Sequence, residues 1–392
     1  MSMTMTVRVL GSACAVAMTA TAAPAFADDD QAIVLSGEVA FDLAGVVAGG
    51  YPHRVHAVDT IFVTAEIDLE KLVGWGGATS SLTFLSTGDG SPNDDVGALQ
   101  GINNNEVGER HQRLFEAWIQ QDFGDKASLR VGQQDLNGEF YVTDAAGLLL
   151  APQSGLASEL AASGPGGPST YPQTGLAVRL AFKPSEDTYI QGGVYNARVG
   201  NIGDHGGVDT TLDDGFVQIV EAGWTGQGKI AVGAWRYSRD QDDLFDTDTS
   251  GDPVQRTSQG FYVTAERMFF DGGEDGRSLS GFVRGGVSDG DTGPFESSWQ
   301  TGILVGHALK SRPDSQFSIG YDQAQLGDKY RAASAAGGQP LGRTESHAEI
   351  TYFDQITEHF SIQPDLQVVW HPGGVASAKP AWVGTIRFGA SF

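Results

Sequence analysis

The sequence contains a single cysteine, Cys14, and it lies in a segment that we expect to be removed on export. The mature chain then has no thiol for a disulfide, a thiolate metal site or a cysteine nucleophile. Its eight histidines are scattered, and no His-Glu-x-x-His motif occurs. These absences disfavour an enzyme and a cofactor. A phospholipase or protease whose catalytic residues meet only in the folded chain stays open as an alternative.

Basic residues are also scarce, with 24 Lys and Arg against 49 Asp and Glu. Loss of Arg8 with the export segment leaves 23 against 49, a net charge of about −26. A nucleic-acid backbone is bound by a basic face. We therefore expect no nucleic-acid partner.

Long hydrophobic runs are missing. No stretch after residue 30 approaches 18 apolar residues, and no period near 3.6 is sustained, which disfavours helical folds in membrane or water. One shorter apolar run lies between Arg8 and the small-residue site Ala25-Phe26-Ala27, a pattern typical of a secretory signal peptide. We expect a signal peptide at 1–27. No linker or composition shift divides 28–392, so we expect one domain there.

Alternation with period two runs through the whole mature chain. Ile61, Val63 and Ala65, for example, alternate with Thr64 and Glu66. Turn signals separate sixteen candidate strands, most of them about ten residues long or slightly longer, the length that a tilted strand needs to cross hydrocarbon. They lie near 36–48, 56–70, 78–88, 110–123, 126–134, 173–183, 187–197, 214–225, 228–238, 258–270, 277–288, 297–309, 315–325, 343–354, 358–370 and 379–392.

The connections between these strands alternate in length. Short links are expected at 124–125, 183–187, 226–227 and 355–357, somewhat longer ones at 71–77, 271–276 and 310–314, and long loops at 89–109, 135–172, 198–213, 239–257 and 326–342. Short periplasmic turns and long external loops are typical of outer-membrane barrels. Only closure satisfies every peptide group in lipid, and sixteen strands enclose water. We predict an all-β fold, a transmembrane antiparallel β-barrel of about 16 strands. A soluble β-sandwich is the alternative.

The last segment alternates strictly and ends in an aromatic residue, Phe392. Trp382 and Ile386 share one face, while Thr385 and Arg387 share the other. An amphipathic final strand with a terminal aromatic residue resembles the signal that barrel-assembly machinery recognises. We therefore expect this machinery as a partner and the bacterial outer membrane as the location.

Five segments carry a more specific likeness. They are HQRLFEAWIQQDFG at 111–124, ASLRVGQ at 127–133, GLAVRL at 175–180 after Tyr171-Pro172, GAWRY at 233–237 and GFVR at 281–284. From residue 111 onwards, roughly two-thirds of the chain resembles the carbohydrate-selective porin family, the OprB-type porins. The resemblance implies a sixteen-stranded barrel that admits sugars such as glucose without a cofactor or an energy input.

Alternation also predicts which side chains line the lumen. In 111–123 we expect Phe115, Ala117 and Ile119 to face lipid and the residues between them to face inward. Sugar hydroxyls pair with guanidinium and carboxylate groups, and sugar C–H faces stack on aromatic rings. Alternatively, such residues are ordinary wall residues whose charges neutralise one another. The candidate solute-contacting residues are Glu116, Trp118, Arg130, Arg179 and Arg284.

The longest loop, 135–172, contains the run Ala145-Ala146-Gly147-Leu148-Leu149-Leu150, which is too apolar for a freely solvated loop. We expect the run to pack against the wall or to form a short helix, and the loop to fold into the pore and narrow it. An external cap is the alternative.

One acidic segment has the spacing of a calcium loop. Asp246, Asp248, Ser250 and Asp252 would offer alternate oxygens to a hard cation. The twelfth position is Thr257 instead of a bidentate Glu. We therefore favour a solvated acidic loop without a metal.

Together these features predict a passive, carbohydrate-selective channel for small sugars. The alternatives are a general or ion-preferring porin, and a structural or adhesive barrel. Outer-membrane lipid and lipopolysaccharide are further expected partners. A homo-oligomer is compatible with this interpretation, although no sequence feature indicates a self-complementary face.

Overall fold

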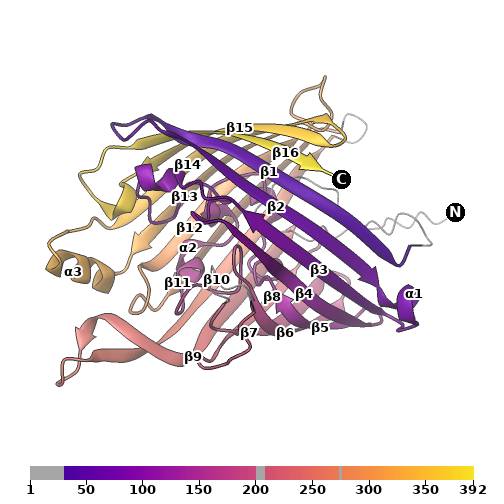
Figure 1. The fold of residues 1–392 in the computed structure, drawn as a ribbon, viewed down its shortest axis with the longest axis horizontal. Helices are drawn as coiled ribbons and strands as arrows, with labels where there is room; N and C mark the ends of the chain where they lie inside the picture. Colours follow the sequence, from indigo (N-terminus) through magenta and orange to yellow (C-terminus); the bar gives the residue numbers. More distant parts are fainter. Residues whose placement is uncertain (1–30, 200–207, 273–275) are drawn as a thin grey trace.

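The computed structural model describes residues 31–199, 208–272 and 276–392, so the predicted signal peptide lies outside the described residues. Sixteen antiparallel strands form a closed barrel in chain order, and β1 pairs with β16 to close it (Figure 1). The predicted fold class is confirmed. No helix in the described ranges has the length and hydropathy needed to cross a membrane.

The strands are β1 (Ile33–Ala48), β2 (Val55–Asp68), β3 (Ala78–Thr87), β4 (His111–Phe123), β5 (Ala127–Gln134), β6 (Gly175–Ser185), β7 (Thr188–Asn196), β8 (Phe216–Trp224), β9 (Lys229–Thr247), β10 (Pro253–Asp271), β11 (Ser278–Ser288), β12 (Phe295–Gly306), β13 (Gln316–Leu326), β14 (Thr344–Thr357), β15 (Phe360–Trp370) and β16 (Ala381–Ser391). The short helices are α1 (Leu69–Val73), α2 (Ser158–Ala161) and α3 (Asp328–Ala336), with 3₁₀ turns η1 (Pro92–Asp95), η2 (Asp144–Ala146), η3 (Pro152–Ser154) and η5 (Pro372–Gly374).

Strand β6 illustrates how the two faces of the wall differ. Val178, Leu180 and Phe182 point outward and are 48%, 56% and 47% exposed, whereas Arg179 between them points inward and is 3% exposed. Apolar side chains on the outside suit contact with lipid, and polar side chains suit an aqueous interior. The same division holds in β16, where Trp382 is exposed and its inward neighbours are buried.

Strand β4 departs from the predicted alternation at one point. Thr83 pairs with Glu116 but Phe84 pairs with Leu114, so Phe115 is an extra residue in the ladder. This β-bulge turns the Phe115 ring inward, where it is 5% exposed. The expectation that Phe115 faces lipid is wrong. The residues after the bulge keep the predicted phase.

The expectation of a long loop at 239–257 is also wrong. Strands β9 and β10 continue through most of this range and meet in a turn at 248–252. Figure 1 shows this hairpin projecting beyond the barrel. Polar side chains pair across it; the Gln255 amide, for example, donates to Asp242 over 2.7 Å. Such cross-strand pairs stabilise a hairpin without an apolar face.

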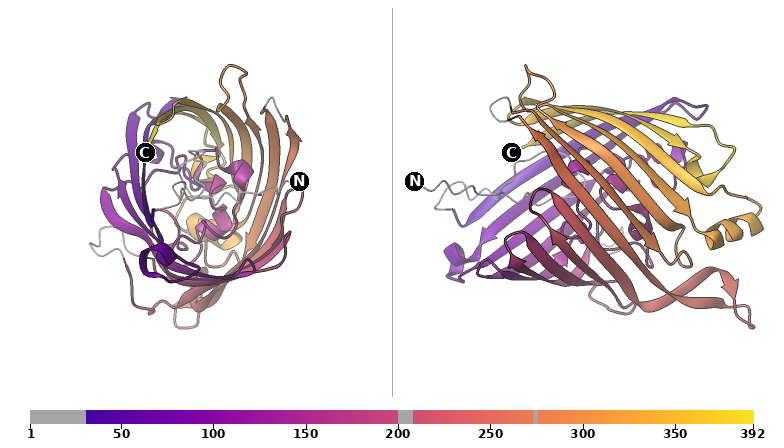
Figure 2. Two further views of the ribbon diagram at one scale, coloured as in Figure 1. Left: turned by 90° about the vertical axis from the view of Figure 1, so that its right-hand side faces the viewer. Right: turned by 180° about the vertical axis from the view of Figure 1, so that it is seen from behind.

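Two of the long connections enter the barrel instead of standing above it. They are residues 88–110, here called the first interior loop, and residues 135–174, here called the second interior loop. Figure 2 shows the second interior loop with helix α2 inside the ring of strands. The candidate functional site lies where this loop meets the wall.

Candidate functional site

A row of polar residues crosses β4, β5 and β6. Gln120 pairs with Arg130, and Arg130 pairs with Arg179, so the three side chains lie side by side on the inner wall. The Gln120 carbonyl oxygen accepts hydrogen bonds from Arg130 Nε at 3.0 Å and Arg179 Nη2 at 2.8 Å. We call these three residues the arginine row.

The second interior loop brings a carboxylate to this row. Glu139 Oε1 lies 2.6 Å from Arg130 Nη1, and Glu139 Oε2 lies 3.0 Å from Arg179 Nε. The three side chains are 15%, 17% and 4% exposed, in the order Glu139, Arg130 and Arg179. Two adjacent guanidinium groups would repel each other, and the shared carboxylate stabilises them.

An aromatic ring adjoins the arginine row. The guanidinium carbon of Arg130 lies 3.9 Å from the centroid of the Trp118 ring, in cation–π geometry. Trp118 pairs with Gly132, whose φ is +138°, and a Cβ there would lie 2.6 Å from the Trp118 Cα. The wall therefore needs glycine opposite Trp118.

Glu116 points inward as expected, and there it contacts the second interior loop. Its Oε1 accepts a hydrogen bond from the backbone N–H of Asp135 at 2.9 Å, which fixes the start of the second interior loop. Burial, with a smaller contribution from the Glu116 charge, raises the pKa of the Asp135 carboxyl to about 7. Glu116 thus holds the loop beside the arginine row.

Arg284 lies beneath the second interior loop and is 1% exposed. Its guanidinium donates to the carbonyl oxygens of Ser154 at 2.7 Å, Gly155 at 3.0 Å and Tyr141 at 3.2 Å. The expectation that Arg284 contacts solute is therefore wrong, because the loop covers it. Of the five candidates, the structure brings Glu116, Trp118, Arg130 and Arg179 together and places Arg284 apart from them.

Inward carboxylates hold the same loop at three further points. Backbone N–H groups of the loop donate to Glu221 on β8 (from Tyr141, 2.9 Å), Glu266 on β10 (from Ala145, 2.9 Å) and Glu349 on β14 (from Ala151, 3.1 Å). A hydrogen bond to a charged group contributes about 1.5–3 kcal/mol. The loop is therefore fixed to the wall across the barrel. Sequence reasoning missed these residues, because alternation shows only that they face inward.

The apolar run of the second interior loop contributes a packing contact. Ala145, Ala146 and Leu149 form a buried cluster with Phe282 of β11, and η2 begins the run. Leu149 also covers Gly320, where a Cβ would lie 2.5 Å from a Leu149 methyl. The run lies against the wall and is shielded from water.

The first interior loop is held in the same way. The two carboxylate oxygens of Glu345 accept from the N–H groups of Leu99 and Gln100, each at 2.9 Å. The loops join where Asn104 N–H donates to the Leu150 carbonyl at 2.8 Å. Both loops thus form one framework inside the barrel.

The candidate calcium ligands do not converge. Asp246 pairs with Lys329 of α3 at 2.8 Å, while Asp248 Oδ1 accepts from the N–H groups of Ser250 and Asp252 at 2.7 and 3.1 Å. Within the described residues, no group of three or more His, Cys, Asp or Glu could hold a metal ion. The segment is the turn of the β9–β10 hairpin.

A model of the carbohydrate-selective porin, OprB family, matches residues 56–392. The chain belongs to this family. It is therefore a porin of the bacterial outer membrane that passes carbohydrates by passive diffusion, and its family is one of channels and not of enzymes. A Gly-x-Ser-x-Gly match at 286–290 does not alter this, because Ser288 ends a strand and its hydroxyl donates to the Phe295 carbonyl at 2.6 Å.

Individual relatives agree with the family assignment. Porin B of Pseudomonas aeruginosa is 24% identical over 380 residues, which cover 85% of this chain and 81% of the relative. A high-pH structure of Pseudomonas putida OprB has a TM-score of 0.82 at 21% identity, covering 92% of this chain and 94% of the other. The DcaP channel of Acinetobacter baumannii has a TM-score of 0.56 at 12% identity, covering 92% and 97%. The two structures show the shared fold.

Proposed function

We propose that this porin prefers small neutral sugars such as glucose, and that they pass beside the arginine row and the Glu139 carboxylate that it binds. The observation that carries the proposal is the partly charge-compensated row beside an indole ring, in which the one carboxylate of Glu139 pairs with both Arg130 and Arg179. Sugar hydroxyls can pair with the guanidinium and amide groups of such a row, and the sugar C–H face can stack on Trp118.

The pairing of both arginines with Glu139 also affects which solutes are disfavoured. An ion that enters a narrow passage loses hydration and needs a counter-charge in return. Here both guanidinium groups already contact Glu139, so a passing anion gains less from them than from two unpaired arginines. A neutral polyhydroxyl solute loses less hydration and still finds donors and acceptors. This difference supports a sugar preference over an ion preference.

Liposome swelling with the refolded protein tests the proposal. Glucose, a disaccharide, an amino acid and a small organic acid are compared at matched osmolarity. We expect glucose to enter faster than the equally small amino acid. Entry ordered by size alone would instead indicate a general porin, and no entry of any solute would indicate a structural or adhesive barrel.

Two tryptophan variants test whether the preference for glucose over the amino acid arises at the arginine row. Trp118→Ala removes the ring beside the arginine row, whereas Trp299→Ala removes a ring that is 43% exposed on the outer wall. We expect the first variant to reduce the advantage of glucose over the amino acid and the second to preserve it. An equal loss in both would locate the effect in barrel stability and not in the passage.

We also propose that barrel-assembly machinery recognises the last strand and that lipid and lipopolysaccharide surround the wall. Phe392 supports the first proposal, because its backbone exchanges two 3.1 Å hydrogen bonds with Gly37 where β1 meets β16. The ring is 74% exposed. Phe392→Ala should therefore lower the yield of inserted barrel in cells, measured against Phe123→Ala on the outer face of β4.

A further inference from the structure

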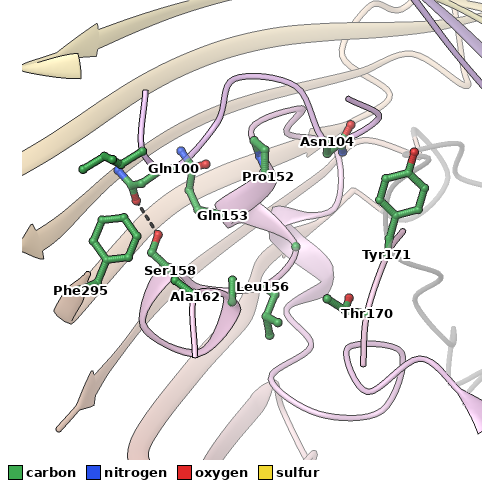
Figure 3. A pocket seen from close by; sticks show the side chains of 13 residues that line it. Gln100, Asn104, Pro152, Gln153, Leu156, Ser158, Ala162, Thr170, Tyr171 and Phe295 are labelled. Atoms are coloured by element: carbon green, nitrogen blue, oxygen red, sulfur yellow. Dashed lines mark hydrogen bonds between the residues drawn. The ribbon is translucent and has the colours of Figure 1, made fainter. Parts of the chain in front are cut away.

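A cavity of about 240 Å³ lies between the two interior loops. Figure 3 shows Gln100, Gln153 and Ser158 on one side of it and Thr170 and Tyr171 on the other. None of the described residues that line it carries a charge. This uncharged lining contrasts with the 49 acidic residues of the whole chain.

The cavity lies on the long-loop side of the arginine row. Phe295, which lines it, is the first residue of β12 at the end where the long loops emerge. Arg130 and Arg179 instead lie in the middle of β5 and β6. A solute that enters from the long-loop side therefore reaches the cavity before it reaches the row.

One polar atom in this lining has no partner. Gln153 is 2% exposed, and its amide nitrogen donates to Asp322 at 2.9 Å, but its Oε1 accepts no hydrogen bond. A buried acceptor without a donor is costly, and a ligand hydroxyl can supply the donor. The neighbouring hydrogen bond from Ser158 Oγ to Gln100 Oε1, at 2.6 Å, fixes two more polar groups of the lining.

The rest of the lining is apolar or aromatic. Pro152, Leu156 and Phe295 contribute hydrocarbon surface. The Tyr171 hydroxyl donates to the Asn105 carbonyl at 3.0 Å, so its ring is held in place. Hydroxyl partners together with C–H surface match the two faces of a sugar ring, whereas an ionic solute would find no counter-charge.

We propose that this cavity is an outer subsite that holds one uncharged sugar ring before it reaches the arginine row. The inference rests on the proposed sugar preference and adds a second place of contact. The side-chain oxygen Oε1 of Gln153 accepts a hydrogen bond from a sugar hydroxyl there. Sugar acids and amino sugars bind the subsite more weakly than glucose, because its lining cannot compensate their charge.

Current block by glucose in planar bilayers tests the subsite with the full mature porin. Gln153→Leu removes the free acceptor, and Ala161→Leu narrows the cavity from an exposed position of α2. We expect Gln153→Leu to raise the half-blocking glucose concentration about three- to tenfold, the range of one hydrogen bond. Ala161→Leu should also raise it, because the larger side chain occupies part of the cavity. Gln112→Leu, at an exposed position of β4, is the matched control and should leave it unchanged.

The outcomes separate the two proposals. If wild-type protein shows neither glucose block nor glucose entry, the sugar preference itself is wrong. If glucose blocks both cavity variants as strongly as wild type while Trp118→Ala relieves the block, glucose binds at the row alone and the subsite is refuted. If Gln153→Leu does not insert into the bilayer, the Ala161→Leu result alone tests the subsite. Residue 161 is exposed and lines the cavity, so a larger side chain can extend into the cavity without disturbing the wall. A higher half-blocking glucose concentration in both variants, with unchanged KCl conductance, supports the subsite.

Discussion

Glu139→Gln tests whether the Glu139 carboxylate offsets part of the positive charge of Arg130 and Arg179 in the passage. The substitution keeps the size of the side chain and one carbonyl oxygen, but it removes the charge that Arg130 and Arg179 share at 2.6 and 3.0 Å. The passage then carries one additional positive charge. We expect the porin to change from a weak ion preference to a clear preference for anions.

The magnitude follows from Coulomb's law. At about 7 Å from a passing ion and an effective dielectric constant of about 80, a unit charge contributes about 0.6 kcal/mol, a factor of about three. Because the charge attracts anions and repels cations, the anion-to-cation permeability ratio should rise about eightfold. The low-dielectric loop beside the row would raise this figure further.

Reversal potentials in planar bilayers under a KCl gradient measure this ratio. Glu358→Gln is the matched control, because it removes the same charge from a side chain that is 86% exposed in the β14–β15 turn. The control should leave the ratio within about twofold of wild type, since a charge more than a Debye length away is screened. If folded Glu139→Gln protein gives the same reversal potential as this control, Glu139 does not act on the ion path.

Three further outcomes follow from the structure. Arg284→Met removes the bonds to the second interior loop and should increase open-channel current noise, whereas unchanged noise would show that the other contacts suffice. Burial raises the pKa of Glu106 to about 7, so the folded first interior loop favours the neutral carboxyl and loses stability as pH rises from about 4.5 through about 7. Channel closures should therefore become more frequent as the pH rises from about 5 to about 7, and Glu106→Gln should abolish this trend. A pH response that persists in the variant would show that another group causes it. Gly132→Ala forces a Cβ against the Trp118 backbone and should destabilise the barrel by about 1–3 kcal/mol. Heat-dependent gel mobility measures this loss, and a mobility like that of wild type would contradict the prediction.

The barrel could be predicted from the sequence because its cause is local. A strand with lipid on one side and water on the other must alternate, and this pattern continues through β16 and through β6 as far as Phe182. The β9–β10 hairpin could not be predicted in the same way. Beyond the lipid there is no apolar face, so its polar residues resembled a loop.

The candidate site was predictable to the extent that it depends on strand phase. Arg130 and Arg179 face inward as expected, because β5 and β6 pair without a bulge at these positions. Phe115 was misplaced because one extra residue in β4 inverts the phase locally. Glu139 meets the arginines, and Arg284 meets the loop carbonyls, only through the path of the second interior loop, and no sequence period records that path.

The acidic excess of this porin does not by itself predict a cation channel. Glu221, Glu266, Glu345 and Glu349 point into the barrel, but each accepts backbone N–H groups of an interior loop. Glu139, in turn, contacts two arginines. These carboxylates hold the framework that narrows the barrel, and their charge is directed at loop dipoles and guanidinium groups instead of the solute path. Under the proposed sugar preference, an acidic sequence thus builds a passage that suits a neutral solute, and we expect its ion selectivity to depend on pairing at the arginine row and not on net charge.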